Sequence, residues 1–136
     1  MADMSKAYEM YKAGFSCGQI VATFLSEICG FDEKAARAAL GGFGGGMYCG
    51  ETCSAAVGAV YSLGMYCNHC EYNDPQAGDK IVAMTKEFTE KFSAKHGSLA
   101  CRDLCKPTDL HKCGEYIDTA VSLVSELVER DREKSN

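Results

Sequence analysis

The sequence contains no tryptophan, only two prolines among its 136 residues, and no long apolar run. Because proline interrupts helices, so low a proline content leaves room for long helices. No stretch approaches the roughly 20 consecutive apolar residues that a membrane-spanning helix needs, so we expect no direct membrane insertion. The sustained alternation of apolar and polar residues that is typical of half-buried strands is also missing.

Basic residues are scarce as well. The 14 Lys and Arg are outnumbered by 19 Asp and Glu, which gives a formal net charge of −5, and the basic residues form no cluster. Nucleic-acid recognition needs a basic patch, so we expect no nucleic-acid partner. The N-terminal stretch MADMSKAYEM lacks the apolar core and cleavage site of a secretory signal, which predicts a cytoplasmic protein.

Cysteine, in contrast, is abundant, with nine residues. Disulfides that serve only structure are rare in the cytoplasm, so a cysteine-rich cytoplasmic chain indicates metal or redox chemistry. An odd number of cysteines also cannot pair completely within one chain.

Apolar residues recur at helical spacing along the whole chain. The segment CSAAVGAVYSLG, residues 53–64, consists mainly of small residues and predicts a buried central helix with Thr52 as its N-cap. Residues 98–112 predict a short helical turn and a loop, and the charged tail after residue 128 is expected to fray. The length fits one domain covering residues 1–136. We therefore predict an all-α, single-domain helical bundle of about five to six helices around a small-residue central helix, with a homodimer as a possible assembly.

Four cysteines lie at or near predicted helix starts: Cys17, Cys53, Cys101 and Cys113. The first N–H groups of a helix are unpaired, and its N-terminus carries about half a positive charge. This environment lowers the pKa of a thiol and favours the thiolate, which is both the nucleophile and the metal ligand. The competing interpretation for any one of them is simple packing, because free cysteine is often buried.

The positions of these cysteines resemble the C-GCAxxG-C-C family of redox-active proteins, from about residue 8 to residue 128. The segments that carry the resemblance are Gly14-Phe15-Ser16-Cys17-Gly18-Gln19, the glycine run 41–46, Cys53-Ser54-Ala55-Ala56-Val57-Gly58, Gly97 with Cys101-Arg102-Asp103-Leu104, and Cys113. The resemblance implies a redox role with the four cysteines as its centre. It also implies that Ser54 and Gly58 lie beside a cofactor at Cys53.

Two departures from the family pattern matter for the site. Ser54 stands where the central motif has glycine, and Gly18 stands where the first motif, N-C-A-Q, has a small side chain. A serine at position 54 adds a hydroxyl group at a place where the motif glycine would leave room for a ligand.

Three functions remain open for the four cysteines. They could ligate an iron–sulfur cluster for electron transfer or redox sensing, since four thiolates complete a [2Fe–2S] or [4Fe–4S] centre. They could instead act without a cofactor as a thiol–disulfide oxidoreductase, for example by pairing Cys17 with Cys53. A zinc-stapled structural or binding module is the third alternative, although structural zinc ligands usually come in closely spaced pairs. The redox partner, and whether the protein is an enzyme, are not evident from the sequence.

The remaining cysteines and the histidines give weaker signals. Cys67 and Cys70 form a C-x-x-C that could be an accessory metal or dithiol site, with Cys49 and His69 as further candidate ligands, or could be two loop thiols. We interpret Cys29 and Cys105 as packing or surface residues. His96 and His111 lie near key cysteines in the sequence, but we interpret them as surface or capping residues. The glycine run 41–50 fits no nucleotide-binding pattern and predicts a loop that packs near Cys53.

Overall fold

The computed structural model describes residues 3–104 and 110–135, and within them the chain forms seven α-helices. These are α1 (Met4–Lys12), α2 (Cys17–Cys29), α3 (Glu33–Leu40), α4 (Ser54–Cys67), α5 (Pro75–His96), α6 (Cys101–Leu104) and α7 (Leu110–Ser135). Two short turns, η1 (Gly41–Phe43) and η2 (Gly46–Gly50), connect α3 to α4. These residues include no strand, and their one β-bridge joins Thr52 to Ala100. The predicted all-α bundle is confirmed.

Side-chain caps and left-handed residues set the helix boundaries. The carboxylates of Asp3, Asp32 and Asp74 accept hydrogen bonds from backbone N–H groups in the first turns of α1, α3 and α5. Gly30 and Gly97 end α2 and α5 in the left-handed conformation that glycine adopts without strain. Most of these boundaries follow from local sequence.

Two predicted boundaries are wrong. The N-cap of the central helix is Cys53 rather than Thr52, so the thiol itself occupies the capping position. The charged tail does not fray, since α7 continues to Ser135. Long-range ion pairs account for this, because Arg130 binds Glu87 of α5 and Asp131 binds Lys80 of α5. The predicted loop around Pro107 lies outside the described residues.

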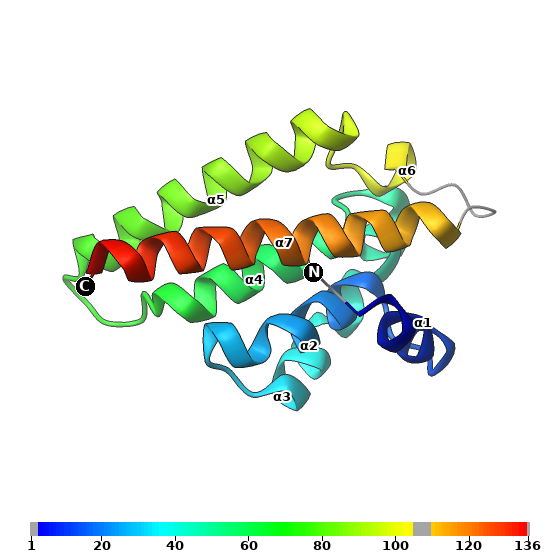
Figure 1. Ribbon diagram of the computed structural model, residues 1–136, viewed down its shortest axis with the longest axis horizontal. Coiled ribbons are helices and arrows are strands. Elements are labelled where there is room, and N and C mark those ends of the chain that lie inside the picture. Colours follow the sequence, from blue (N-terminus) through cyan, green and yellow to red (C-terminus); the bar gives the residue numbers. More distant parts are fainter. Residues whose placement is uncertain (1–2, 105–109, 136) are drawn as a thin grey trace.

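Helix α4 lies at the centre of the bundle and packs against α2, α5 and α7. Figure 1 shows that α2, α4 and α7 all begin at the right-hand end of the molecule, where α6 also lies. The core between them contains fully buried Phe88, Phe92 and Leu63. The parallel direction of three packed helices therefore brings their N-termini to one end of the fold. No helix in the described parts is both long and apolar enough to cross a membrane.

Candidate four-cysteine redox site

Each of the four predicted cysteines lies at a helix start, as expected. Cys17 is the first residue of α2, Cys53 is the N-cap of α4, Cys101 is the first residue of α6, and Cys113 lies in the first turn of α7. Since α2, α4, α6 and α7 begin at the same end of the bundle, these positions gather there (Figure 1).

Cys53 is the one fully buried member of this group. It is only 2% exposed. Burial raises the pKa of its thiol, the backbone N–H groups of Ala56 and Ala55 lower it, and the charges of Cys101 and Cys113 raise it further. The two N–H groups lie in the first turn of α4, where helix N–H groups have no partner within the helix. The electrostatic effects of Cys101 and Cys113 also show that all three thiols share one neighbourhood.

A short antiparallel pairing holds Cys53 near Cys101. The Cys53 N–H donates to the Leu99 carbonyl with an N–O distance of 2.6 Å, and the Cys101 N–H donates to the Glu51 carbonyl at 2.5 Å. These two bonds flank the bridge between Thr52 and Ala100. This register places Cys53 opposite Leu99 and Cys101 opposite Glu51, so the two cysteines lie diagonally across the pairing although they are almost fifty positions apart in the sequence. No local sequence pattern pointed to this pairing.

A close helix contact brings the start of α2 to the start of α4. The Gly18 N–H donates a hydrogen bond of 2.8 Å to Ser54 Oγ, and a Cβ added to Gly58 would lie 2.5 Å from the Gly18 carbonyl oxygen. Gly18 follows Cys17 and Ser54 follows Cys53, so this contact sets the positions of two cysteines. Ser54 and Gly58 therefore pack against α2, and their predicted role beside a cofactor stays a prediction.

The glycine run 41–50 forms one wall of the cysteine end. A Cβ on Gly46 would lie 2.6 Å from the backbone N and O of Glu51 and 2.8 Å from Cys101 Cβ. A Cβ on Gly44 would lie 3.0 Å from Ser16 Cβ. The loop thus packs tightly against the neighbours of three cysteines, which confirms its predicted role as a packing element near Cys53.

This loop contains a turn of left-handed backbone. Gly45, Gly46, Met47 and Tyr48 all have positive φ, between 55° and 64°. The conformation costs a residue with a Cβ roughly 1–2 kcal/mol, so Met47 and Tyr48 are held there by their surroundings. Both side chains are exposed, Tyr48 to 74%. The sequence indicated a loop here but not its handedness.

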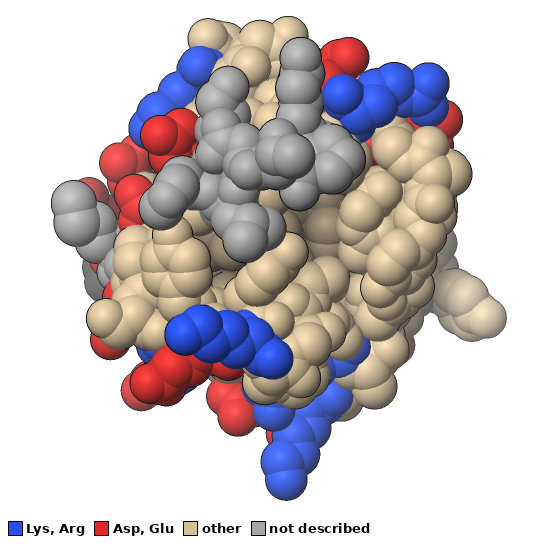
Figure 2. Space-filling view, turned by 90° about the vertical axis from the view of Figure 1, so that its right-hand side faces the viewer, with Lys and Arg blue, Asp and Glu red and all other residues tan. Residues whose placement is uncertain are grey.

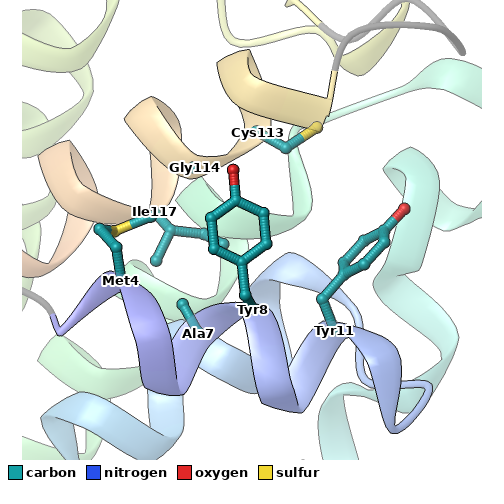
Figure 3. Close-up of a pocket in the computed structure, with 7 residues that line it drawn as sticks. All are labelled: Met4, Ala7, Tyr8, Tyr11, Cys113, Gly114 and Ile117. Atoms are coloured by element: carbon teal, nitrogen blue, oxygen red, sulfur yellow. The ribbon is translucent and has the colours of Figure 1, made fainter.

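Cys113 borders a small apolar pocket between α1 and α7. Its lining is Met4, Ala7, Tyr8, Tyr11, Cys113, Gly114 and Ile117. Figure 3 shows Tyr8 and Tyr11 side by side on α1, with the Tyr8 ring reaching toward Gly114. Figure 2 shows this end of the molecule face on: uncharged side chains border a hollow near the centre, and a basic side chain lies below it.

Comparison with known families agrees with this arrangement. Residues 15–127 match the family described as "Putative redox-active protein (C_GCAxxG_C_C)". The chain belongs to this family. The match includes all four cysteines at the helix starts, so the redox role implied by their pattern is the family's own description. No curated protein and no solved structure matches the chain.

The C_GCAxxG_C_C cysteines do not form a site for a single metal ion. Among residues 3–104 and 110–135, no group of three or more Cys, His, Asp or Glu side chains is arranged to bind one. Metal–sulfur bonds of about 2.3 Å would put the sulfurs of a tetrahedral site about 3.8 Å apart. Whether the four cysteines bind iron, zinc or no metal therefore stays a prediction.

The C-x-x-C motif divides between two environments. Cys67 turns toward the core, where its sulfur lies 3.6 Å from Met84 Sδ and burial raises the pKa of its thiol. Cys70 is exposed, and its sulfur contacts Asn68 Oδ1 at 3.5 Å. One thiol of the pair is therefore partly buried, and the other is exposed to solvent. Cys29 is buried, in agreement with the packing interpretation, whereas Cys105 lies outside the described residues.

Neither of the two histidines with a described side chain, His69 and His96, is placed to act together with the four cysteines. His96 Nε2 lies 2.9 Å from Thr119 Oγ1, and its ring packs against Phe92 and Tyr116. Burial and the charge of Lys95 lower its pKa. The His69 ring packs against Gly78 in the α4–α5 region. The side chain of His111 lies outside the described part of the chain.

Proposed function

We propose that this protein transfers or senses electrons through an iron–sulfur cluster held by Cys17, Cys53, Cys101 and Cys113. The observation that carries the proposal is that all four cysteines lie at helix starts at one end of the bundle, with Cys53 buried. Four cysteine sulfurs are the full ligand set of a [2Fe–2S] or [4Fe–4S] cluster, and helix N-termini favour the negative charge of such a centre.

Two features of the chain fit an additional group at this end. Ser16 Oγ, next to Cys17, is buried and is the one such side-chain oxygen or nitrogen in the described chain without a hydrogen-bond partner. The donor set also has the right chemistry, because thiolates are the preferred ligands of iron–sulfur clusters. When bound, such a cluster would accept and release single electrons at a potential set by its charge, hydrogen bonds and exposure.

The residues of the chain would contribute position and environment. The α2–α4 contact at Gly18 and Ser54 fixes the distance between Cys17 and Cys53, and the Leu99 carbonyl holds the backbone of Cys53. The N–H groups of Ala55 and Ala56 direct positive dipoles at the Cys53 sulfur, which would stabilise its thiolate once the proton leaves. The burial of Cys53 keeps water from this side of the centre.

Anaerobic purification tests the proposal. We expect a brown protein with stoichiometric iron and acid-labile sulfide, and a visible absorption band that bleaches on reduction. Cys53→Ala should lose the band and the iron, whereas Cys70→Ala should retain both, because Cys70 is an exposed thiol outside the four-cysteine group. Colourless, iron-free wild-type protein after anaerobic reconstitution with iron and sulfide would refute the cluster.

Thiol–disulfide chemistry is a second candidate, favoured by the backbone pairing that holds Cys53 near Cys101. The thiolate of Cys101, which is less buried than Cys53, would attack a small or protein disulfide RS–SR and release RS⁻. Cys53, after losing its proton, would then attack the mixed disulfide, form an internal disulfide and release the second thiolate. Two thiols are oxidised and one external disulfide is reduced to two thiols, so the electrons balance.

Titration against a glutathione redox series separates the two candidates. If the iron-free protein is a dithiol, its oxidation to the disulfide should remove two hydrogens and two titratable thiols. The change should occur in one reversible two-electron transition. Peptide mapping should identify Cys53 and Cys101 in the product. If the iron-free protein forms no reversible internal disulfide, this second function is ruled out.

A further inference from the structure

A hollow lies between α4 and the segments on either side of it. Its volume is about 300 Å³, and its lining residues are Leu40, Phe43, Thr52, Ala56, Val57, Val60, Tyr61, Thr89 and Leu99. These residues come from three parts of the chain: the end of α3 with η1, helix α4 with the segment before it, and α5 with the segment after it. Figure 1 shows α3 and α5 on opposite sides of α4. The hollow therefore has walls from several elements and is a pocket rather than a bare helix face.

Packing beneath the surface holds the walls of this hollow in place. Leu40 is 1% exposed and belongs to a small buried cluster against which Phe43 and Tyr61 pack. The Tyr61 ring meets the Phe31 ring edge to face, with the ring centroids 5.5 Å apart. Because contacts within the chain already fix these side chains, a ligand would bind without first having to order them.

The lining favours a small, flat and uncharged ligand. None of its nine side chains carries a charge, so a charged group would lose its hydration here without gaining an ion pair. Phe43 and Tyr61 are aromatic, and a planar ring packed against them gains more than the area it buries. The volume lies at the lower end of the range for ligand pockets, which limits the ligand to about one or two fused rings.

The hollow shares a wall with Cys53. Ala56 lines the hollow, and its N–H group is one of the two that lower the pKa of the Cys53 thiol. Leu99 also lines the hollow, and its carbonyl oxygen accepts the hydrogen bond from the Cys53 N–H. Thr52, a third lining residue, directly precedes Cys53. A ligand in the hollow is therefore separated from the buried thiol by a single layer of residues.

We propose that the hollow binds a small, uncharged quinone that exchanges electrons with the four-cysteine centre. The inference rests on the redox function proposed above and adds the class of its electron partner. Flavin and nicotinamide cofactors carry phosphate groups, for which the uncharged lining offers no partner. A quinone is flat and neutral and accepts electrons, so it meets each requirement of the hollow and of its position.

The electron balance follows from the form of the centre. If Cys53 and Cys101 act as a dithiol, their two thiols become a disulfide, and the two electrons and two protons convert the quinone to a hydroquinone. If the centre is an iron–sulfur cluster, each reduced cluster gives one electron. Two protein molecules, with two protons from solvent, then convert one quinone to one hydroquinone.

Equilibrium dialysis of the reduced, iron-free full chain with 2,3-dimethyl-1,4-naphthoquinone tests the binding site. This quinone has no free position on its quinone ring to which the exposed thiols of Cys49 and Cys70 could add. Val60→Trp fills the hollow and should weaken binding by at least about ten-fold. Thr89→Phe should do the same from the α5 wall. Val82→Trp is the matched control, because Val82 is 53% exposed on α5 and does not line the hollow.

Stopped-flow absorption measures electron exchange separately, on reduced protein from which the reductant has been removed. Val60→Trp should slow oxidation of the centre by the quinone at least about ten-fold, in line with its weaker binding. Ferricyanide is an anion that the uncharged lining excludes, so it should oxidise the wild type and the variant at equal rates. Circular dichroism would establish that each variant is folded.

Three results would overturn the proposal: a wild-type protein that binds no quinone, folded Val60→Trp and Thr89→Phe variants that both bind it normally, or an unchanged rate of oxidation by the quinone in Val60→Trp. Binding to the iron-free chain does not depend on a cluster. A colourless protein that binds the quinone would refute the cluster and support the hollow. A brown protein that binds none would refute the quinone and leave the cluster in place.

Discussion

Gly18 and Ser54 meet at the contact of α2 with α4, where the Gly18 N–H donates to Ser54 Oγ over 2.8 Å. A Cβ at position 18 would lie 2.6 Å from both the hydroxyl and the carbonyl oxygen of Ser54. Both positions depart from the C_GCAxxG_C_C pattern. The departures compensate each other, because the missing side chain at one position makes room for the added hydroxyl at the other. Ser54 also satisfies one of the unpaired N–H groups at the start of α2.

Gly18→Ala should destabilise the fold by about 1–3 kcal/mol, since it forces an extra methyl group into a closed contact. Combining it with Ser54→Gly should recover part of that loss. The hydroxyl clash is then removed, but the carbonyl oxygen of residue 54 is still close. Urea unfolding of both single variants and the double variant measures the coupling between the two positions. Additive effects of the two substitutions would show that the compensation is absent.

Gly46→Ala and Gly45→Ala separate backbone strain from steric contact. Both glycines have positive φ, so alanine at either should cost about 1 kcal/mol. At Gly46 the added Cβ also meets the backbone of Glu51 and Cβ of Cys101, which should bring the loss to about 3 kcal/mol or more. At Gly45 the nearest atom is Tyr48 Cδ1 at an ordinary 3.7 Å. Equal unfolding free energies for the two variants would contradict the close packing of this loop on Cys101.

Met47→Gly should make the protein more stable, by about 1 kcal/mol. Met47 has a φ of 59°, and glycine adopts this conformation without the Cβ penalty. Lys86→Gly is a useful contrast, because the same change in the exposed interior of α5 should destabilise by about 1 kcal/mol. Thermal unfolding of the two variants should therefore shift in opposite directions. A loss of stability in Met47→Gly would mean that the methionine side chain contributes more than its strained backbone costs.

Alkylation of the metal-free, reduced protein should follow exposure and pKa. Cys49 and Cys70 are exposed and should react first with iodoacetamide. Cys53 and Cys29 should react last, because both are buried and burial raises the pKa of each thiol. Timed quenching and peptide mass spectrometry give the order. Rapid labelling of Cys53 in folded protein would show that its end of the bundle is open.

The stability of the protein should decline in alkaline solution, partly because of Cys29. Burial raises the pKa of this thiol from 9.0 to about 12, against a smaller lowering by Arg132. The stabilisation is complete below pH 9 and is lost as the pH rises toward about 12, with a slope of up to about 1.4 kcal/mol per pH unit. Cys29→Ala should lose some stability at neutral pH but show a shallower decline between pH 9 and 11. Identical slopes in urea unfolding would exclude this contribution.

Local sequence determined the helices and the positions of the four cysteines within them. Apolar spacing gave the stripes of α2 and α7, and Asp32 marked the cap of α3, because these signals act within one or two turns of the chain. The same short range explains the one-residue error at Cys53. Thr52 is an ordinary capping residue, and nothing in the local sequence indicates that a neighbouring backbone at Leu99 binds position 53 instead.

The tertiary structure alone brought the helix starts that carry the four cysteines together. The contacts that do this join residues far apart in the chain, Gly18 with Ser54 and Glu51 with Cys101, and their formation depends on how whole helices pack. Packing likewise kept α7 helical through its charged tail, because Glu87 and Lys80 of α5 supply opposite charges for Arg130 and Asp131. The sequence therefore determined that four thiols sit at helix starts. The parallel packing of α2, α4 and α7 brought those starts to a single end of the molecule.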